Sequence, residues 1–159
     1  MNIFIILGFL VLLSAPSEAS EDFKPFLTDY CTSYPEGTRA KPDLWKHCCE
    51  EHDLFFWGGG SLEDRKATDL RLKSCVEATG ERVQARLIYA AVSLGGRSPI
   101  RFKTKQWGNA FEESRPRYQA LSEQETTDLV HYLETHNPEL SEKLKQKFKD
   151  QLNSRLDVQ

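Results

Sequence analysis

The sequence predicts an all-α fold, built on an antiparallel pair of helices and extended by further helices toward the C-terminus. Apolar side chains recur at helical spacing between residues 44 and 56, and Ser61 followed three residues later by Asp64 is typical of the start of a second helix. Only residues 57–60 separate the two helices, and so short a connection favours antiparallel neighbours. The residues with which these two helices face each other are therefore the candidates for chemistry.

Residues 42–56 form the first predicted helix. Pro42 suits a first turn, Asp43 complements the positive end of the helix dipole, and the glycines at 58–60 end the helix. One stripe collects its apolar side chains, namely Leu44, Trp45, Cys48, Cys49, His52, Phe55 and Phe56. We therefore expect His52 to point into the protein and Asp53 to lie at the edge of the stripe.

The second predicted helix runs from its N-cap Ser61 to about Thr79, before Gly80. Its inward stripe consists of Arg65, Asp69, Leu72, Cys75 and Val76. In an antiparallel pair, Asp69 is the residue best placed to face His52. A histidine on an apolar stripe is most often a hydrogen-bonded core residue, so Asp69 could simply satisfy it.

The cysteines are compatible with that pairing of helices. Cys48 lies four residues before His52 and Cys75 six residues after Asp69, so both are displaced in the same direction, by about 6 and 9 Å. A Cys48–Cys75 disulfide would therefore also hold Asp69 near His52. Four cysteines permit three pairings, and the sequence alone does not choose among them.

The first 19 residues are typical of a secretory signal peptide. Residues 2–15 are almost wholly apolar, and Ser17 and Ala19 offer small side chains for cleavage after Ala19. All four cysteines follow this segment, so we expect a secreted or periplasmic protein with two disulfides. The rest of the chain divides into a domain at 20–120 and a C-terminal helical extension at 121–159. A net charge of −3 suggests no nucleic-acid partner, and the sequence identifies no protein partner.

A third helix is predicted over residues 81–94, with Gly95 and Gly96 ending it. Its core-facing residues would be Val83, Leu87, Ala91 and Leu94. A loop over 97–117 should follow, in which basic and aromatic side chains alternate. Such a mixture suits the headgroups of an anionic bilayer, and the predicted membrane contacts are Arg101, Lys103, Lys105 and Trp107. The alternative is a solvated loop whose aromatic side chains fold back on the core.

The extension contains two more predicted helices. One begins at Ser122, with Glu125 completing its cap, and the other at Asn137, with Pro138 opening it. Their few apolar side chains could dock on the domain or on a partner, and these are Leu129, Leu133, Leu140, Leu144 and Phe148.

The segment Cys-Cys-Glu-Glu-His-Asp at 48–53, with Asp69 followed six residues later by Cys75, resembles the secreted phospholipase A2 family. The likeness covers residues 30–76, and the short glycine link at 58–60 is closer to compact microbial members. The resemblance implies disulfides Cys31–Cys49 and Cys48–Cys75. It also implies calcium-dependent hydrolysis of the sn-2 ester of phospholipids at a membrane surface.

The same resemblance assigns roles to individual residues. His52 would be the general base that activates water, and Asp69 would orient its ring. Asp53 would bind the calcium ion, and the backbone carbonyls of the upstream loop would complete the oxygen ligands that this hard cation prefers. The candidate carbonyls are those of Tyr30, Thr32 and Tyr34.

The chain departs from the family at two places. The family's loop is glycine-rich after its cysteine, whereas residues 32–38 contain a single glycine, Gly37. Phe56 stands where the family usually has a tyrosine that bonds to the second aspartate, so that hydrogen bond must come from elsewhere or be missing. Two other functions therefore stay open, a non-catalytic phospholipase-like module and a hydrolase of a non-lipid ester or amide. A zinc site at the cysteines is a further alternative, although export favours disulfides.

Overall fold

The computed structural model describes residues 23–97, 110–111, 116 and 118–156, and the predicted signal peptide and membrane-contact residues lie outside these ranges. Within them the protein is helical, which confirms the all-α prediction. The helices are α1 (Lys46–Trp57), α2 (Leu62–Ala78), α3 (Arg82–Arg97), α4 (Glu123–His136) and α5 (Glu142–Leu156). Among the residues described, no helix has the length and apolar character needed to cross a bilayer.

Capping boxes start α2 and α4 where the sequence predicted them. The Ser61 hydroxyl accepts the amide of Asp64, while the Asp64 carboxylate accepts the amide of Ser61 at 2.8 Å. Ser122 and Glu125 make the same reciprocal pair at α4. Helix α2 ends at Ala78, just before Gly80, whose φ of 95° only glycine adopts easily.

Three predicted helix boundaries are wrong. Helix α1 begins at Lys46, because the Trp45 amide and indole N–H instead donate to the carbonyls of Glu36 and Pro35. Helix α3 continues through both of its glycines to Arg97, since glycine costs only about 1 kcal/mol inside a helix and stops one only where the chain turns. Helix α5 begins at Glu142, after a turn over residues 137–141.

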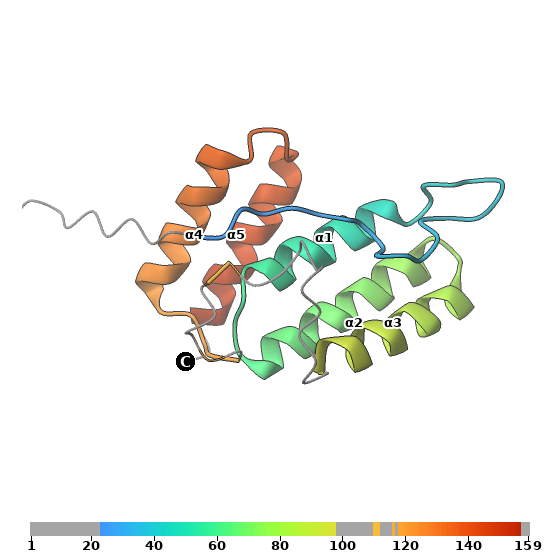
Figure 1. Cartoon of the computed structure of the whole chain (residues 1–159), viewed down its shortest axis with the longest axis horizontal. Helices are drawn as coiled ribbons and strands as arrows, with labels where there is room; N and C mark the ends of the chain where they lie inside the picture. The colour runs from blue at the N-terminus through green and yellow to red at the C-terminus, as the bar shows by residue number, and fades with distance from the viewer. Residues whose placement is uncertain (1–22, 98–109, 112–115, 117, 157–159) are drawn as a thin grey trace, which may run out of the picture.

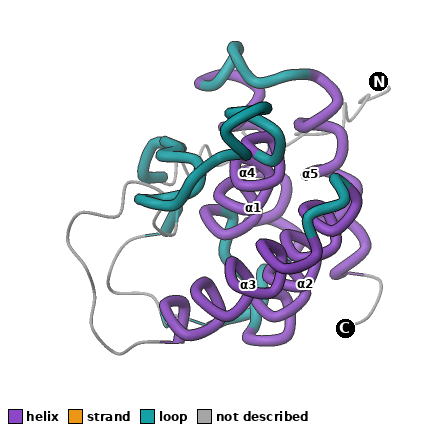
Figure 2. Tube along the Cα trace, turned by 90° about the vertical axis from the view of Figure 1, so that its right-hand side faces the viewer, coloured by secondary structure: helices purple, strands orange, loops and turns teal. Residues whose placement is uncertain are grey.

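Helix α1 is the centre of the molecule. It lies between the α2–α3 pair on one side and the α4–α5 hairpin on the other (Figures 1 and 2). The cluster toward α2 and α3 consists of Trp45, Cys48, Cys49, Leu72, Val76, Ala85 and Ile88. The cluster toward the hairpin includes Leu54, Phe55 and Trp57 of α1 together with Leu129, Leu133, Leu140, Leu144, Phe148 and Leu152. The C-terminal helices therefore dock on the domain and share a core with α1.

Burial of α1 on both sides corrects the sequence prediction of a single inward stripe. Leu54 and Trp57 lie off that stripe and are fully buried, because the hairpin and the N-terminal segment cover them. The indole of Trp57 donates to the carbonyl of Lys24 at 2.8 Å, and its own carbonyl accepts the amide of Ala110 at 2.8 Å. Segments far apart in sequence thus converge on the end of α1.

Helix α5 also holds the link between α1 and α2. The Arg155 side chain forms an ion pair with Asp64 at 3.1 Å and donates to the carbonyl of Gly59 at 3.1 Å. Gly60, with a φ of 115°, leaves the space that the Arg155 guanidinium occupies. The link between α1 and α2 is therefore held by a residue close to the C-terminal end of the chain.

Helix α3 presents a different face to the core from the one predicted. Val83, Leu87 and Leu94 are 67%, 54% and 76% exposed, and the buried residues are instead Ala85 and Ile88. Both faces of α3 are apolar, so the sequence pattern alone could not decide which one packs on α2.

The docking of α5 on α1 can be tested at Phe148. We expect Phe148→Ala to lower the free energy of unfolding by about 3–5 kcal/mol, because the ring is 1% exposed and packs against Phe55 and Trp57. The adjacent exposed substitution Lys149→Ala should change it by less than about 0.5 kcal/mol in the same urea titration. Equal effects of the two substitutions would mean that the hairpin is not part of the core.

Candidate active site

The antiparallel packing of α1 and α2 brings His52 and Asp69 together. The Nε2 atom of His52 lies 3.0 Å from Oδ1 of Asp69, and both side chains are buried. The disulfide between Cys48 and Cys75, with a Cα–Cα distance of 5.7 Å, joins the same two helices. The His52–Asp69 contact expected from the sequence is thus present.

A second disulfide, Cys31–Cys49, fastens the loop at residues 30–34 to α1. Both disulfides are those that the resemblance implied, and together they indicate an oxidising environment. The group formed by His47, Cys48 and Cys75 is no metal site, although His47 Nε2 lies 3.4 and 3.6 Å from the two sulfurs. Both sulfurs are bonded to each other and so are not thiolates, which removes the zinc alternative at the cysteines.

Asp53 lies beside His52 and is 3% exposed, deeper than the stripe's edge where the sequence placed it. Its Oδ1 is 3.9 Å from Nδ1 of His52, and its Oδ2 accepts the hydroxyl of Thr28 at 2.7 Å. Burial raises the pKa of Asp53, and the nearby His52 ring and the hydrogen bond from Thr28 offset this only in part. No sequence pattern pointed to Thr28, which lies in an irregular segment without periodicity.

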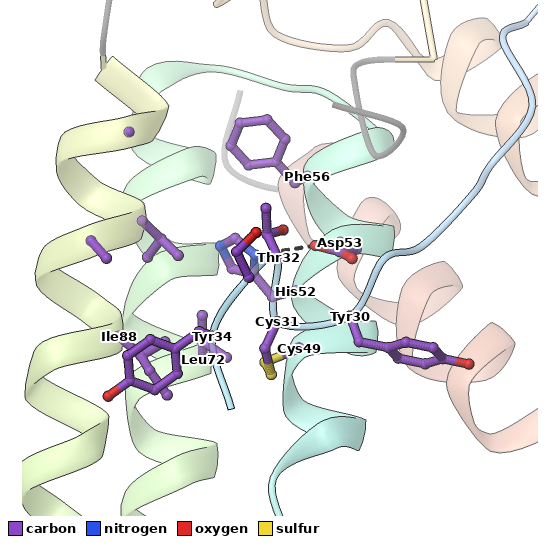
Figure 3. A pocket seen from close by; sticks show the side chains of 14 residues that line it. Tyr30, Cys31, Thr32, Tyr34, Cys49, His52, Asp53, Phe56, Leu72 and Ile88 are labelled. Carbon is purple, nitrogen blue, oxygen red and sulfur yellow. Dashed lines mark ion pairs between the residues drawn. A yellow bond between two sulfur atoms is a disulfide. The ribbon is translucent and has the colours of Figure 1, made fainter. Parts of the chain in front are cut away.

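His52 therefore sits between two carboxylates. Burial alone would lower the pKa of the imidazole, but Asp53 and Asp69 on either side outweigh burial, and the pKa is raised. Because Nε2 is engaged by Asp69, Nδ1 is the ring nitrogen on the side of Asp53. Figure 3 shows His52 and Asp53 side by side where they border the pocket.

The loop at residues 30–34 adopts a glycine-like shape without glycine. Tyr30, Thr32 and Ser33 have φ angles of 57°, 42° and 61°, a region that costs non-glycine residues about 1–3 kcal/mol each. Local bonds hold this shape: the Tyr30 amide donates to the Thr28 hydroxyl at 2.9 Å, and the Thr32 hydroxyl donates to Asp29 at 2.8 Å. The missing glycines of the sequence therefore do not prevent the left-handed turns at this place.

Ser93 of α3 provides a second partner for Asp69. Its hydroxyl donates to Oδ2 of Asp69 at 3.3 Å, while Oδ1 of the same carboxylate meets His52. Phe56 has no hydroxyl to offer, and its ring lies under the Arg65 guanidinium at 3.8 Å. The sequence could not identify Ser93, because α3 lies outside the segment that carries the resemblance.

A pocket of about 220 Å³ opens in front of His52 and Asp53. The loop residues Tyr30, Thr32 and Tyr34 line it, as Figure 3 shows. Asp69 is not part of its lining and is connected to the pocket through its contact with His52. The Tyr34 hydroxyl donates to Gln84 of α3 at 2.5 Å, which ties the loop to α3 across the pocket. The remaining walls are largely apolar and include Phe56, Leu72, Ile88, Ala91 and Val92.

No known protein family, curated protein or solved structure matches this chain. Any assignment of function therefore depends on the residues and geometry of the pocket.

The charge on His52 should make the stability of the protein depend on pH. A raised pKa means that protonated His52 stabilises the fold fully below about pH 6.5, and that this contribution is lost as pH rises through the folded-state pKa. In chelator, the free energy of unfolding should fall over that range, and His52→Gln should flatten the profile. His131→Gln, at an exposed position on α4, should leave the slope unchanged. An unaltered slope in His52→Gln would contradict the pKa direction.

Proposed function

We propose that the protein is a hydrolase of the phospholipase A2 type, which cleaves the sn-2 ester of phospholipids with calcium. One observation carries the proposal. Asp69 holds Nε2 of His52, and Nδ1 of the same ring lies on the side of Asp53. His52 and Asp53 both border an apolar pocket. A buried histidine that served only the core would need neither the second carboxylate nor the pocket.

In this proposal His52 is the general base. Nδ1 takes a proton from a water molecule as the water oxygen forms a bond to the ester carbonyl carbon. The carboxylate of Asp69 keeps the proton on Nε2 and stabilises the imidazolium that forms. Ser93 holds the other oxygen of that carboxylate, which limits its rotation. His52 then returns the proton to the leaving alkoxide, and the products are a fatty acid and a lysophospholipid.

The buried carboxylate of Asp53 is the kind of group that a hard cation would bind. The carboxylate is buried and its pKa is raised by burial, so Thr28 and His52 compensate its charge incompletely and a cation would complete the compensation. Asp53 would hold calcium together with the backbone carbonyls of Tyr30, Thr32 and Tyr34. Calcium, when bound, would polarise the ester carbonyl and stabilise the charge that develops on its oxygen.

The pocket favours a lipid over other substrates. Leu72, Ile88 and Val92 offer an apolar wall to an acyl chain, whereas a small soluble ester would gain little from it. The two disulfides indicate an oxidising environment, and with the predicted signal at residues 1–19 they support a secreted or periplasmic enzyme.

The proposal is tested by release of fatty acid. We expect the protein, with both disulfides formed, to release the sn-2 chain of mixed-chain phosphatidylglycerol and phosphatidylcholine in calcium and not in chelator. His52→Gln should lower the rate by about 10²–10⁴-fold, the contribution typical of a general base. His47→Gln, on the same helix but exposed, should retain the rate.

Two other outcomes would replace the proposal. Cleavage of soluble short-chain esters without any cleavage of phospholipid would indicate a hydrolase of another ester. No cleavage of either substrate by the folded protein would indicate a non-catalytic module.

Calcium binding can be measured without activity. Calcium at 100 times its dissociation constant should stabilise the folded protein by about 2.7 kcal/mol, which raises its thermal midpoint. Asp53→Asn should lose this shift, whereas His52→Gln should keep it. Asp43→Asn, which removes an exposed carboxylate from the preceding loop, serves as the charge-matched control. A full shift in Asp53→Asn would show that the ion binds elsewhere.

A further inference from the structure

We infer that the exposed face of α3 is the surface by which the protein docks on an anionic phospholipid bilayer. This inference deepens the proposed function, since it names how the pocket meets its substrate, and it rests on that function for the choice of a lipid. It concerns residues of α3, which are distinct from the loop residues that the sequence suggested for membrane contact.

Five apolar residues form this face, which we call the α3 face: Val83, Leu87, Ala90, Ala91 and Leu94. They recur at helical spacing and make one continuous stripe along α3. Three of them are large and are 67%, 54% and 76% exposed, and they are most of the large apolar side chains exposed in the described part of the chain. Isolated exposed leucines are ordinary, but a stripe of this kind marks a surface that binds something.

The charge beside the α3 face favours an anionic partner. Arg82 and Arg86 are exposed along its edge, and α3 contains no acidic residue. Cations near an anionic bilayer attract it, and apolar side chains then enter the boundary between headgroups and acyl chains.

The α3 face also adjoins the pocket. Ala91 is exposed on the face and lines the pocket, and the neighbouring pocket residues Ile88, Val92 and Gly95 follow on the next side of the same helix. A bilayer that contacts the α3 face therefore lies beside the entrance to the pocket. A lipid could pass from the bilayer toward His52 with its acyl chain against α3 throughout.

Vesicle binding tests the surface separately from catalysis. In chelator, we expect the protein to sediment with vesicles of phosphatidylglycerol and phosphatidylcholine, and less with phosphatidylcholine alone. Leu87→Ser and Leu94→Ser should each weaken binding by about tenfold, because each removes one side chain from the bilayer. Leu70→Ser, on α2 and 49% exposed, is the matched control and should bind as the wild type.

The electrostatic part is tested by charge reversal. Arg82→Glu with Arg86→Glu should abolish the preference for anionic vesicles, whereas Arg39→Glu, at an exposed loop position, should leave it. Absence of wild-type vesicle binding would overturn the inference, as would equal losses in the control variants. It would also be overturned if sedimentation without lipid showed a dimer that the two leucine variants dissociate.

Hydrolysis of a monomeric short-chain phospholipid separates this inference from the proposed function. The two leucine variants should retain that activity, since neither Leu87 nor Leu94 lines the pocket. Hydrolysis of the monomeric lipid without vesicle binding would contradict the α3 docking surface and support the proposed enzyme. Vesicle binding through α3 without any hydrolysis would contradict the proposed enzyme and support the docking surface.

Discussion

The register of α1 against α2 is the constraint on which the rest of the site depends. Each residue of a helix advances 1.5 Å and turns about 100°, so a slip of one residue would carry Asp69 away from His52. The Cys48–Cys75 disulfide fixes that register at one end of the pair, and Arg155 fixes the link at the other through Asp64 and Gly59. The His52–Asp69 contact lies between these two restraints.

The two carboxylates beside His52 have different surroundings. Asp69 has a hydrogen-bond partner on each oxygen, His52 on one and Ser93 on the other, so its carboxylate is well satisfied. Asp53 is more deeply buried, and burial raises its pKa despite the bond from Thr28. The same kind of side chain thus has two different environments beside one imidazole, because its partners differ.

Local pattern predicted the parts of the molecule that local physics determines. The capping box of α2, its inward stripe and the approach of Asp69 to His52 all follow from spacing within 25 residues. The faces of α3, the burial of Leu54 and the contributions of Thr28 and Ser93 depend on contacts with distant segments. Both faces of α3 are apolar, and a serine or threonine outside any motif carries no signal. These features could therefore be identified only once the fold was known.

The dependence of α1 on distant segments has a consequence for how the chain folds. Arg155 and Gly59 are 96 residues apart, and Leu54 and Trp57 are covered only when the hairpin has been made. Contacts of such long range form late, since the chain loses the entropy of a long loop before the contacts can stabilise it. Meanwhile Cys48 and Cys49 are adjacent, and each can reach the partner of the other. Wrong pairs that form before the hairpin docks would have to reshuffle, so the docking of α4 and α5 favours the two native disulfides over the other pairings.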